Sequence, residues 1–150
     1  MSTNQDIAKL DDLIVTTIDS ARGYANSAES AKDTRYADFF NQMAEEREGV
    51  VARLQARSRE LGGTPNEFGS VAAGVHRRWE DLRTALGGGD EAILAEVERG
   101  EDYLEQEWER ALDDDGVSAE TKALLRECFT SVSAGHDRAR VLRDALQATD

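Results

Sequence analysis

The sequence predicts an all-α protein, a four-helix bundle with one long crossover. Four long stretches repeat apolar residues at alternating steps of three and four, which is the period of one buried helical face. The single proline and the clustered glycines divide these stretches sharply. Only a few residues separate the first stretch from the second and the third from the fourth, so each of these pairs is expected to be an antiparallel hairpin.

The first two helices are expected at residues 4–31 and 35–61. Asp33 or Thr34 is the expected N-cap of the second helix, because a short oxygen-bearing side chain satisfies free backbone N–H groups. The pair Gly62 and Gly63 is expected to supply the left-handed conformation that ends a helix, and Pro65 prevents the helix from continuing.

The connection from residue 62 to residue 89 is long and is expected to carry a short extra helix from Ser70 to Leu86. Its apolar residues share one face, and they are Val71, Val75, Trp79, Leu82 and Leu86. Trp79 is therefore predicted to be mostly buried against the bundle. A single long crossover between the second and third helices is the connectivity of ferritin-like bundles, which makes a ferritin-like four-helix bundle the predicted fold.

The third helix is expected at residues 91–113 with Asp90 as its cap, and the fourth is expected to reach about Leu146 with Ser118 as its cap. The acidic turn at residues 113–116 lacks the spacing of a calcium loop and is predicted to be a solvated turn.

Composition limits the functions that the chain can have. The 150 residues suit a single domain spanning residues 1–150, and the net charge of −13 disfavours nucleic acid and anionic lipid as partners. Cys128, the single cysteine, lies on an apolar stripe and is expected in the core. The N-terminus lacks the pattern of a signal peptide and no apolar run is long enough to span a bilayer, so a cytoplasmic protein without membrane contact is expected.

Polar side chains interrupt the apolar stripes near the middle of each helix. Thr17 and Arg47 lie on their stripes and Glu101 and His136 adjoin theirs, with Glu98 one turn before Glu101. Because mid-points of antiparallel helices lie at one level, these residues are expected to form one polar layer. A buried charge requires a partner, so Arg47 is predicted to be buried and paired with Glu101 or Glu98 of the third helix, with His136 as a further donor.

A metal site is the alternative interpretation of the same layer. Di-iron bundles take a glutamate from each of two helices and a Glu-x-x-His motif from each of the other two. Here Glu46, Glu98, Glu101 and His136 are the only candidate ligands, and the residue three before His136 is a serine. An intact two-metal site is therefore not expected, and a single metal ion remains as an alternative. A small anion held by Arg47 and His136 is a third interpretation.

Six stretches carry a resemblance to a known family. They are residues 19–24, 44–47, 61–65, 69–79, 98–102 and 134–138, which follow in order along most of the chain. On these residues the chain resembles a bacterial family of ferritin-like four-helix-bundle proteins of unestablished function. The resemblance implies the fold, a bacterial cytoplasmic protein and a stress-related role, and it implies no reaction.

Two functions are expected from these observations. The first is a structural or interaction protein without a cofactor, in which an ionic layer replaces the metals and two copies pair as a homodimer. The second is a metal-binding oxidoreductase or metal-handling protein using iron or manganese. The sequence contains no nucleophile elbow and no phosphate-binding loop, so neither hydrolase nor nucleotide-dependent chemistry is indicated.

Overall fold

The computed structural model describes residues 3–69 and 89–148, and these residues form helices without any β-strand. The helices are α1 (Thr3–Ser30), α2 (Thr34–Glu60), α4 (Asp90–Asp113) and α5 (Ala119–Ala148). The predicted all-α class and the four long helices are thus confirmed. The expected helix from Ser70 to Leu86, with Trp79, lies outside the described residues. None of the described helices is both long enough and apolar enough to cross a membrane.

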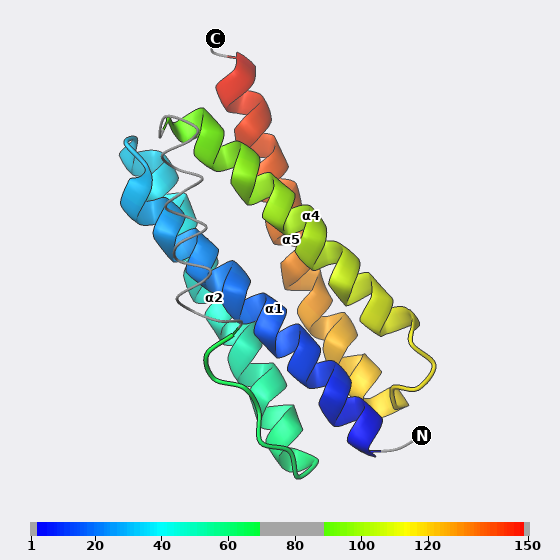
Figure 1. The fold of residues 1–150 in the computed structure, drawn as a ribbon. Helices are drawn as coiled ribbons and strands as arrows, with labels where there is room; N and C mark the ends of the chain where they lie inside the picture. Colours follow the sequence, from blue (N-terminus) through cyan, green and yellow to red (C-terminus); the bar gives the residue numbers. More distant parts are fainter. Residues whose placement is uncertain (1–2, 70–88, 149–150) are drawn as a thin grey trace.

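The helices form two antiparallel hairpins that pack side by side (Figure 1). α1 packs most extensively on α2, α4 packs on α5, and α1 also packs on α4. α2 and α4 run in the same direction, because α2 ends at one end of the bundle and α4 begins at the other (Figure 1). The end of α2 and the start of α4 therefore lie at opposite ends of the bundle.

Local signals at the helix ends act as the sequence predicts, with one exception. The Asp33 side chain caps α2 by accepting a hydrogen bond from the Arg35 backbone N–H, and Gly62 has a φ of +91° just after α2. At α4 the cap position belongs to Gly89, so the prediction that Asp90 is the cap is wrong. The Asp90 carboxylate instead accepts the backbone N–H groups of Lys32 (2.8 Å) and Asp33 (3.0 Å). The start of α4 is thereby tied to the link between α1 and α2.

Asp6 makes an equivalent connection at the opposite end of the bundle. Its side chain is buried at the start of α5, where the Ser118 N–H (2.8 Å), the Ser118 hydroxyl (2.5 Å) and the Thr121 hydroxyl (2.7 Å) donate to it. Ser118 also accepts from the Thr121 N–H, so its predicted capping role is confirmed. Burial alone would raise the pKa of Asp6, but these hydrogen bonds outweigh it and lower the pKa below its usual value.

The core consists of two clusters of buried apolar side chains. The Trp108 cluster contains Leu10, Leu13, Ile14, Ile18, Val50, Val51, Leu54, Leu104, Trp108, Ala111, Val117, Leu125, Cys128 and Val132. The Phe40 cluster contains Tyr24, Tyr36, Phe40, Met43, Ala44, Ile93, Leu94, Val97 and Ala139. Cys128 is buried, as predicted. Each of the four helices contributes to both clusters, so whatever lies between the clusters is surrounded by the whole bundle.

Replacing Asp6 with Asn should lower the free energy of unfolding near neutral pH by about 1–2 kcal/mol, the range for loss of a helix cap. Because the folded-state pKa of Asp6 is lowered, its contribution is present above about pH 4 and is lost as the pH falls through that lowered pKa. Urea unfolding of both proteins at several pH values measures this. The exposed Asp12→Asn variant of the same helix is the control, and an equal loss in that variant would contradict the assignment.

Candidate functional site

A buried ion pair lies between the two apolar clusters. Arg47 of α2 is 0% exposed, Glu101 of α4 is 2% exposed, and the Arg47 Nη2 atom donates to the Glu101 Oε2 atom at 2.9 Å. Along α2, Arg47 separates Ala44 of the Phe40 cluster from Val50 of the Trp108 cluster. The prediction that Arg47 is buried and pairs with an acidic residue of the third long helix is confirmed.

Tyr24 of α1 contacts both members of this ion pair. Its hydroxyl donates to the Glu101 Oε1 atom at 2.5 Å, and its ring lies 5.8 Å from the Arg47 guanidinium carbon, within cation–π range. Burial, together with the negative charge of Glu101, raises the pKa of Tyr24 well above its usual value, so the phenol remains a hydrogen-bond donor. Both oxygens of the Glu101 carboxylate thus have a donor.

The sequence pattern placed Thr17 in the layer and did not single out Tyr24. In the structure Thr17 accepts from the Trp108 indole N–H at 3.4 Å, inside the Trp108 cluster. Tyr24 lies seven residues further along α1, an offset of about 10 Å. The signal that could have found Tyr24 is its hydroxyl, because a buried phenol generally requires a hydrogen-bond partner.

The remaining sides of the Arg47 guanidinium face α1 and α5. Its Nη1 atom donates to the Ser20 hydroxyl and its Nη2 atom to the Val132 carbonyl, each at 3.4 Å. Gly135 gives the guanidinium room, since a Cβ at that position would lie 2.4 Å from Nη2 and 2.5 Å from the Met43 Cε atom. The Nε atom of Arg47 has no hydrogen-bond partner among the described residues.

His136 belongs to a different group of charges from the one that the sequence predicted. Its Nε2 atom is 2.5 Å from the Asp102 Oδ1 atom and its Nδ1 atom is 3.4 Å from the Glu105 Oε2 atom, so the ring bridges α5 to another face of α4. Burial alone would lower the pKa of His136, but these carboxylates raise it above its usual value. Asp137 and Arg140 of α5 also face the ring.

The candidate metal ligands do not come together as a group. Glu46 pairs with Arg138 at 2.5 Å and Glu98 pairs with Arg143 at 2.5 Å, while Glu101 is held by Arg47 and Tyr24. Residues 3–69 and 89–148 contain no group of three or more His, Cys, Asp or Glu side chains that could hold a metal ion. The side chains at these positions are arranged as ion pairs and do not fit a metal centre.

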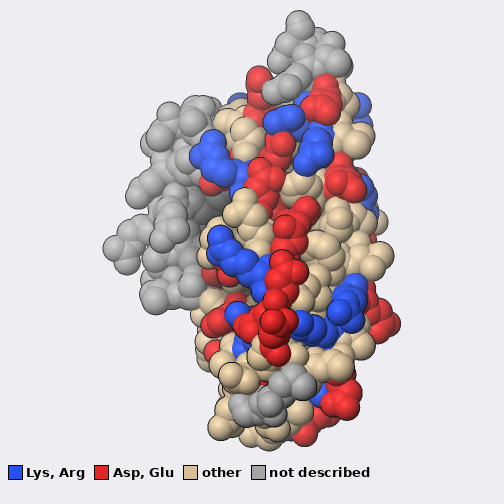
Figure 2. Space-filling view, turned by 90° about the vertical axis from the view of Figure 1, so that its right-hand side faces the viewer, with Lys and Arg blue, Asp and Glu red and all other residues tan. Residues whose placement is uncertain are grey.

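The same pattern extends to the surface. Figure 2 shows a band of acidic side chains, with basic ones beside it, along the side of the molecule on which α4 lies. Surface pairs such as Arg110–Glu107 at 2.6 Å belong to this interleaving of charge. Exposed pairs of this kind each contribute about 1 kcal/mol or less to stability. The buried Arg47–Glu101 pair matters more to the structure, because loss of either partner leaves an unpaired charge in the core.

Comparison with known families identifies the family of this chain. A model of the family described as "Domain of unknown function (DUF2383)" matches residues 5–114. The chain belongs to the DUF2383 family. The DUF2383 match includes Tyr24, Arg47 and Glu101, whereas His136 and all of α5 lie beyond it. A search of curated proteins finds no match. The family description assigns no activity, so functional inference for this DUF2383 chain depends on its own residues.

Gly135→Ala should destabilise the protein by about 1–3 kcal/mol, because the new methyl group overlaps the fixed guanidinium of Arg47. The control is Gly49→Ala on α2, where a Cβ meets nothing within 4 Å and the gain in helix propensity should stabilise the protein by about 0.5–1 kcal/mol. Thermal or urea unfolding of both variants measures these opposite changes in stability. Equal stabilisation by both variants would show that Gly135 is not needed for close approach.

His136 should make stability depend on pH. A raised folded-state pKa means that its stabilising contribution is fully present below about pH 6.5, the unfolded value, and is lost as the pH rises through the folded pKa. The difference in unfolding free energy between wild type and His136→Gln should therefore be larger near pH 6 than near pH 9. Asp102→Asn should reduce this dependence, and a difference that does not change with pH would contradict the pairing.

Proposed function

We propose that this chain is a ferritin-like helical bundle in which an ionic layer takes the place of a metal centre, and that it acts as a structural or interaction protein. Two features support the ferritin-like part of the proposal. α2 and α4 run in the same direction, which a long second connection produces (Figure 1). The side chains of Arg47, Glu101 and Tyr24 also meet in the middle of the bundle, where ferritin-like proteins place their metal ligands.

The Arg47–Glu101 pair is the observation that carries the proposal. A divalent cation needs free carboxylate oxygens, and those of Glu101 accept from Arg47 (2.9 Å) and Tyr24 (2.5 Å). The Arg47 guanidinium also repels a metal cation from this position, because it carries a fixed positive charge at any physiological pH. The layer is therefore suited to fixing how the helices fit together, and it lacks the open coordination that redox chemistry at a metal requires.

The proposal includes the setting implied by the family resemblance. The chain would work in the cytoplasm of a bacterium, in a stress-related role, with a second copy of itself as the first partner to test. Tyr103, which is exposed on α4, is a suitable place to look for such a contact. Sedimentation of the purified protein measures its oligomeric state directly.

The double-mutant cycle of Arg47 and Glu101 tests the proposal. Glu101→Leu should cost about 3–5 kcal/mol, because it leaves the Arg47 charge buried without a partner. Adding Arg47→Met removes that charge, and the double variant should recover most of the lost stability. The measurement is urea unfolding of wild type, both single variants and the double variant, each with and without chelator. The surface variant Glu107→Leu is the control, with an expected loss below about 1 kcal/mol.

The opposite result would favour metal-binding function. A bound metal stabilises only the folded state, so a metal-ligand role for Glu101 predicts a loss confined to metal-loaded protein. Arg47→Met would then rescue nothing. Stoichiometric iron or manganese in protein purified without chelator, together with that pattern, would show that the structural proposal is wrong.

A further inference from the structure

A cavity of about 380 Å³ lies between α1 and α4, beside the ionic layer. Gly23 and Tyr24 belong to its α1 wall, and Glu96, Val97, Gly100 and Leu104 to its α4 wall. Tyr24, Val97 and Leu104 are buried, so the floor of the cavity is continuous with the core. The volume falls within the range of small-molecule sites, about 300–1,000 Å³.

Two glycines keep the walls of this cavity open. Gly23 and Gly100 lie inside α1 and α4, where glycine is less favourable than alanine. Neither has a positive φ, and a Cβ at either position would meet nothing within 4 Å. Neither the backbone conformation nor close packing among the described residues therefore requires glycine there. Their effect is to leave space between the helices.

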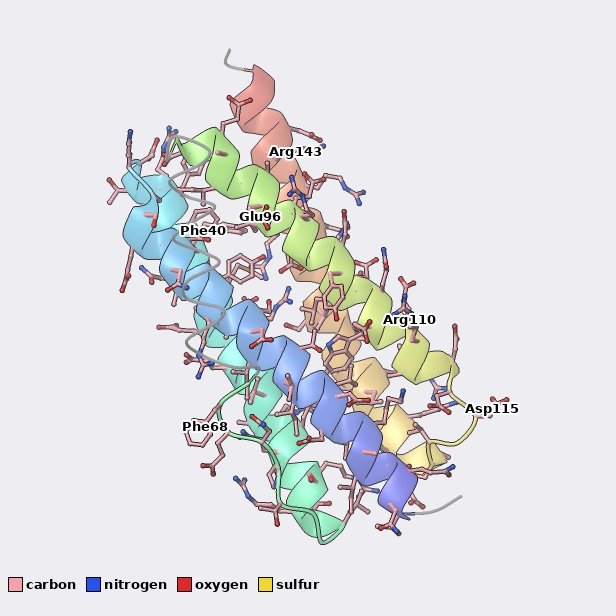
Figure 3. The ribbon with its side chains drawn as sticks, viewed as in Figure 1. Phe40, Phe68, Glu96, Arg110, Asp115 and Arg143 are labelled. Carbon is pink, nitrogen blue, oxygen red and sulfur yellow. The ribbon has the colours of Figure 1, made fainter. Side chains whose placement is uncertain are left out.

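The charge of the cavity selects the kind of molecule that would fit. Asp19, Glu96 and Glu101 line it, and no Lys, Arg or His is among the lining residues described. Arg47 neutralises Glu101, whereas the ion-pair partner of Glu96 within residues 3–69 and 89–148 is Arg99, at 3.1 Å from its Oε2 atom. Arg99 is 72% exposed, and that buried Oε2 atom makes no hydrogen bond to the part of the chain that the structure describes. Figure 3 shows Glu96 on the side of α4 that faces α1 and α2.

We propose that this cavity binds a small organic cation, a primary amine carried on an apolar or aromatic body. The ammonium group would pair with the Glu96 carboxylate, whose Oε2 atom makes no hydrogen bond among the described residues. The body would pack on Val97, Leu104 and the Tyr24 ring, whose negative face also suits a cation. This site shares Tyr24 and Glu101 with the ionic layer, but the structural role proposed for that layer does not depend on whether the cavity is occupied.

Titration of the full-length protein with phenethylamine, followed by amide NMR, tests the proposal. The shifts should be confined to residues 15–27 and 96–104, and the neutral analogue 2-phenylethanol should bind at least about tenfold more weakly. Glu96→Gln should remove that difference between amine and alcohol. Gly100→Leu fills the cavity and should abolish binding, and Gly23→Leu should do the same from the opposite wall. Gly49→Leu is the matched control, because it adds the same side chain to an open position outside the cavity.

Three results would overturn the proposal. The first is no shift at these residues up to the solubility of phenethylamine, which is also the result expected if another part of the chain or a second copy occupies the cavity. The second is equal binding of the amine and the alcohol by wild type. The third is an equal loss of binding in Gly49→Leu and Gly100→Leu.

Discussion

The burial of one charged pair constrains the rest of this bundle. Away from water, the Arg47 guanidinium and the Glu101 carboxylate require partners for nearly all of their donors and acceptors. The groups of this network come from all four described helices. α1 supplies the hydroxyls of Tyr24 and Ser20, and α5 supplies a carbonyl and the space above Gly135. Sliding any helix by one turn would separate at least one of these contacts. The layer therefore ties the register of the four helices together, and it does so where the apolar core is interrupted.

The parts of the fold that depend on local chemistry could be predicted from the sequence. The helix ends at Asp33, Gly62 and Ser118 follow from the preferences of single residues, and the structure has them where the pattern indicates. The buried carboxylate of Asp6 and the role of Asp90 could not be predicted in this way. Their hydrogen-bond partners lie 112 and 58 residues away, so an acidic residue near a helix start looks the same whether it is solvated or buried.

The candidate site was predictable in part for a related reason. Arg47 lies on an apolar stripe, and a buried cation has few alternatives to a carboxylate on a facing helix, so the pair with Glu101 follows. His136 adjoins its stripe rather than lying on it, and one residue corresponds to about 100° around a helix. That rotation directs its ring to Asp102 and Glu105 instead of the central layer. Periodicity gives the face of a helix, but the pairing of borderline positions depends on how the helices are rotated.

The ionic layer and the cavity beside it share a common origin. Arg47 reaches Glu101 from α2 and Tyr24 reaches it from α1, so both oxygens of the carboxylate have a donor without any side chain that fills the cavity. Small residues, Ser20, Gly23 and Ser27, line the α1 wall beside Tyr24. A bundle that met the same requirement with apolar residues would fill this space to the density of an ordinary core. Because Tyr24 and Glu101 belong to both the layer and the cavity wall, an occupant of the cavity would contact the same side chains that hold the helices in register.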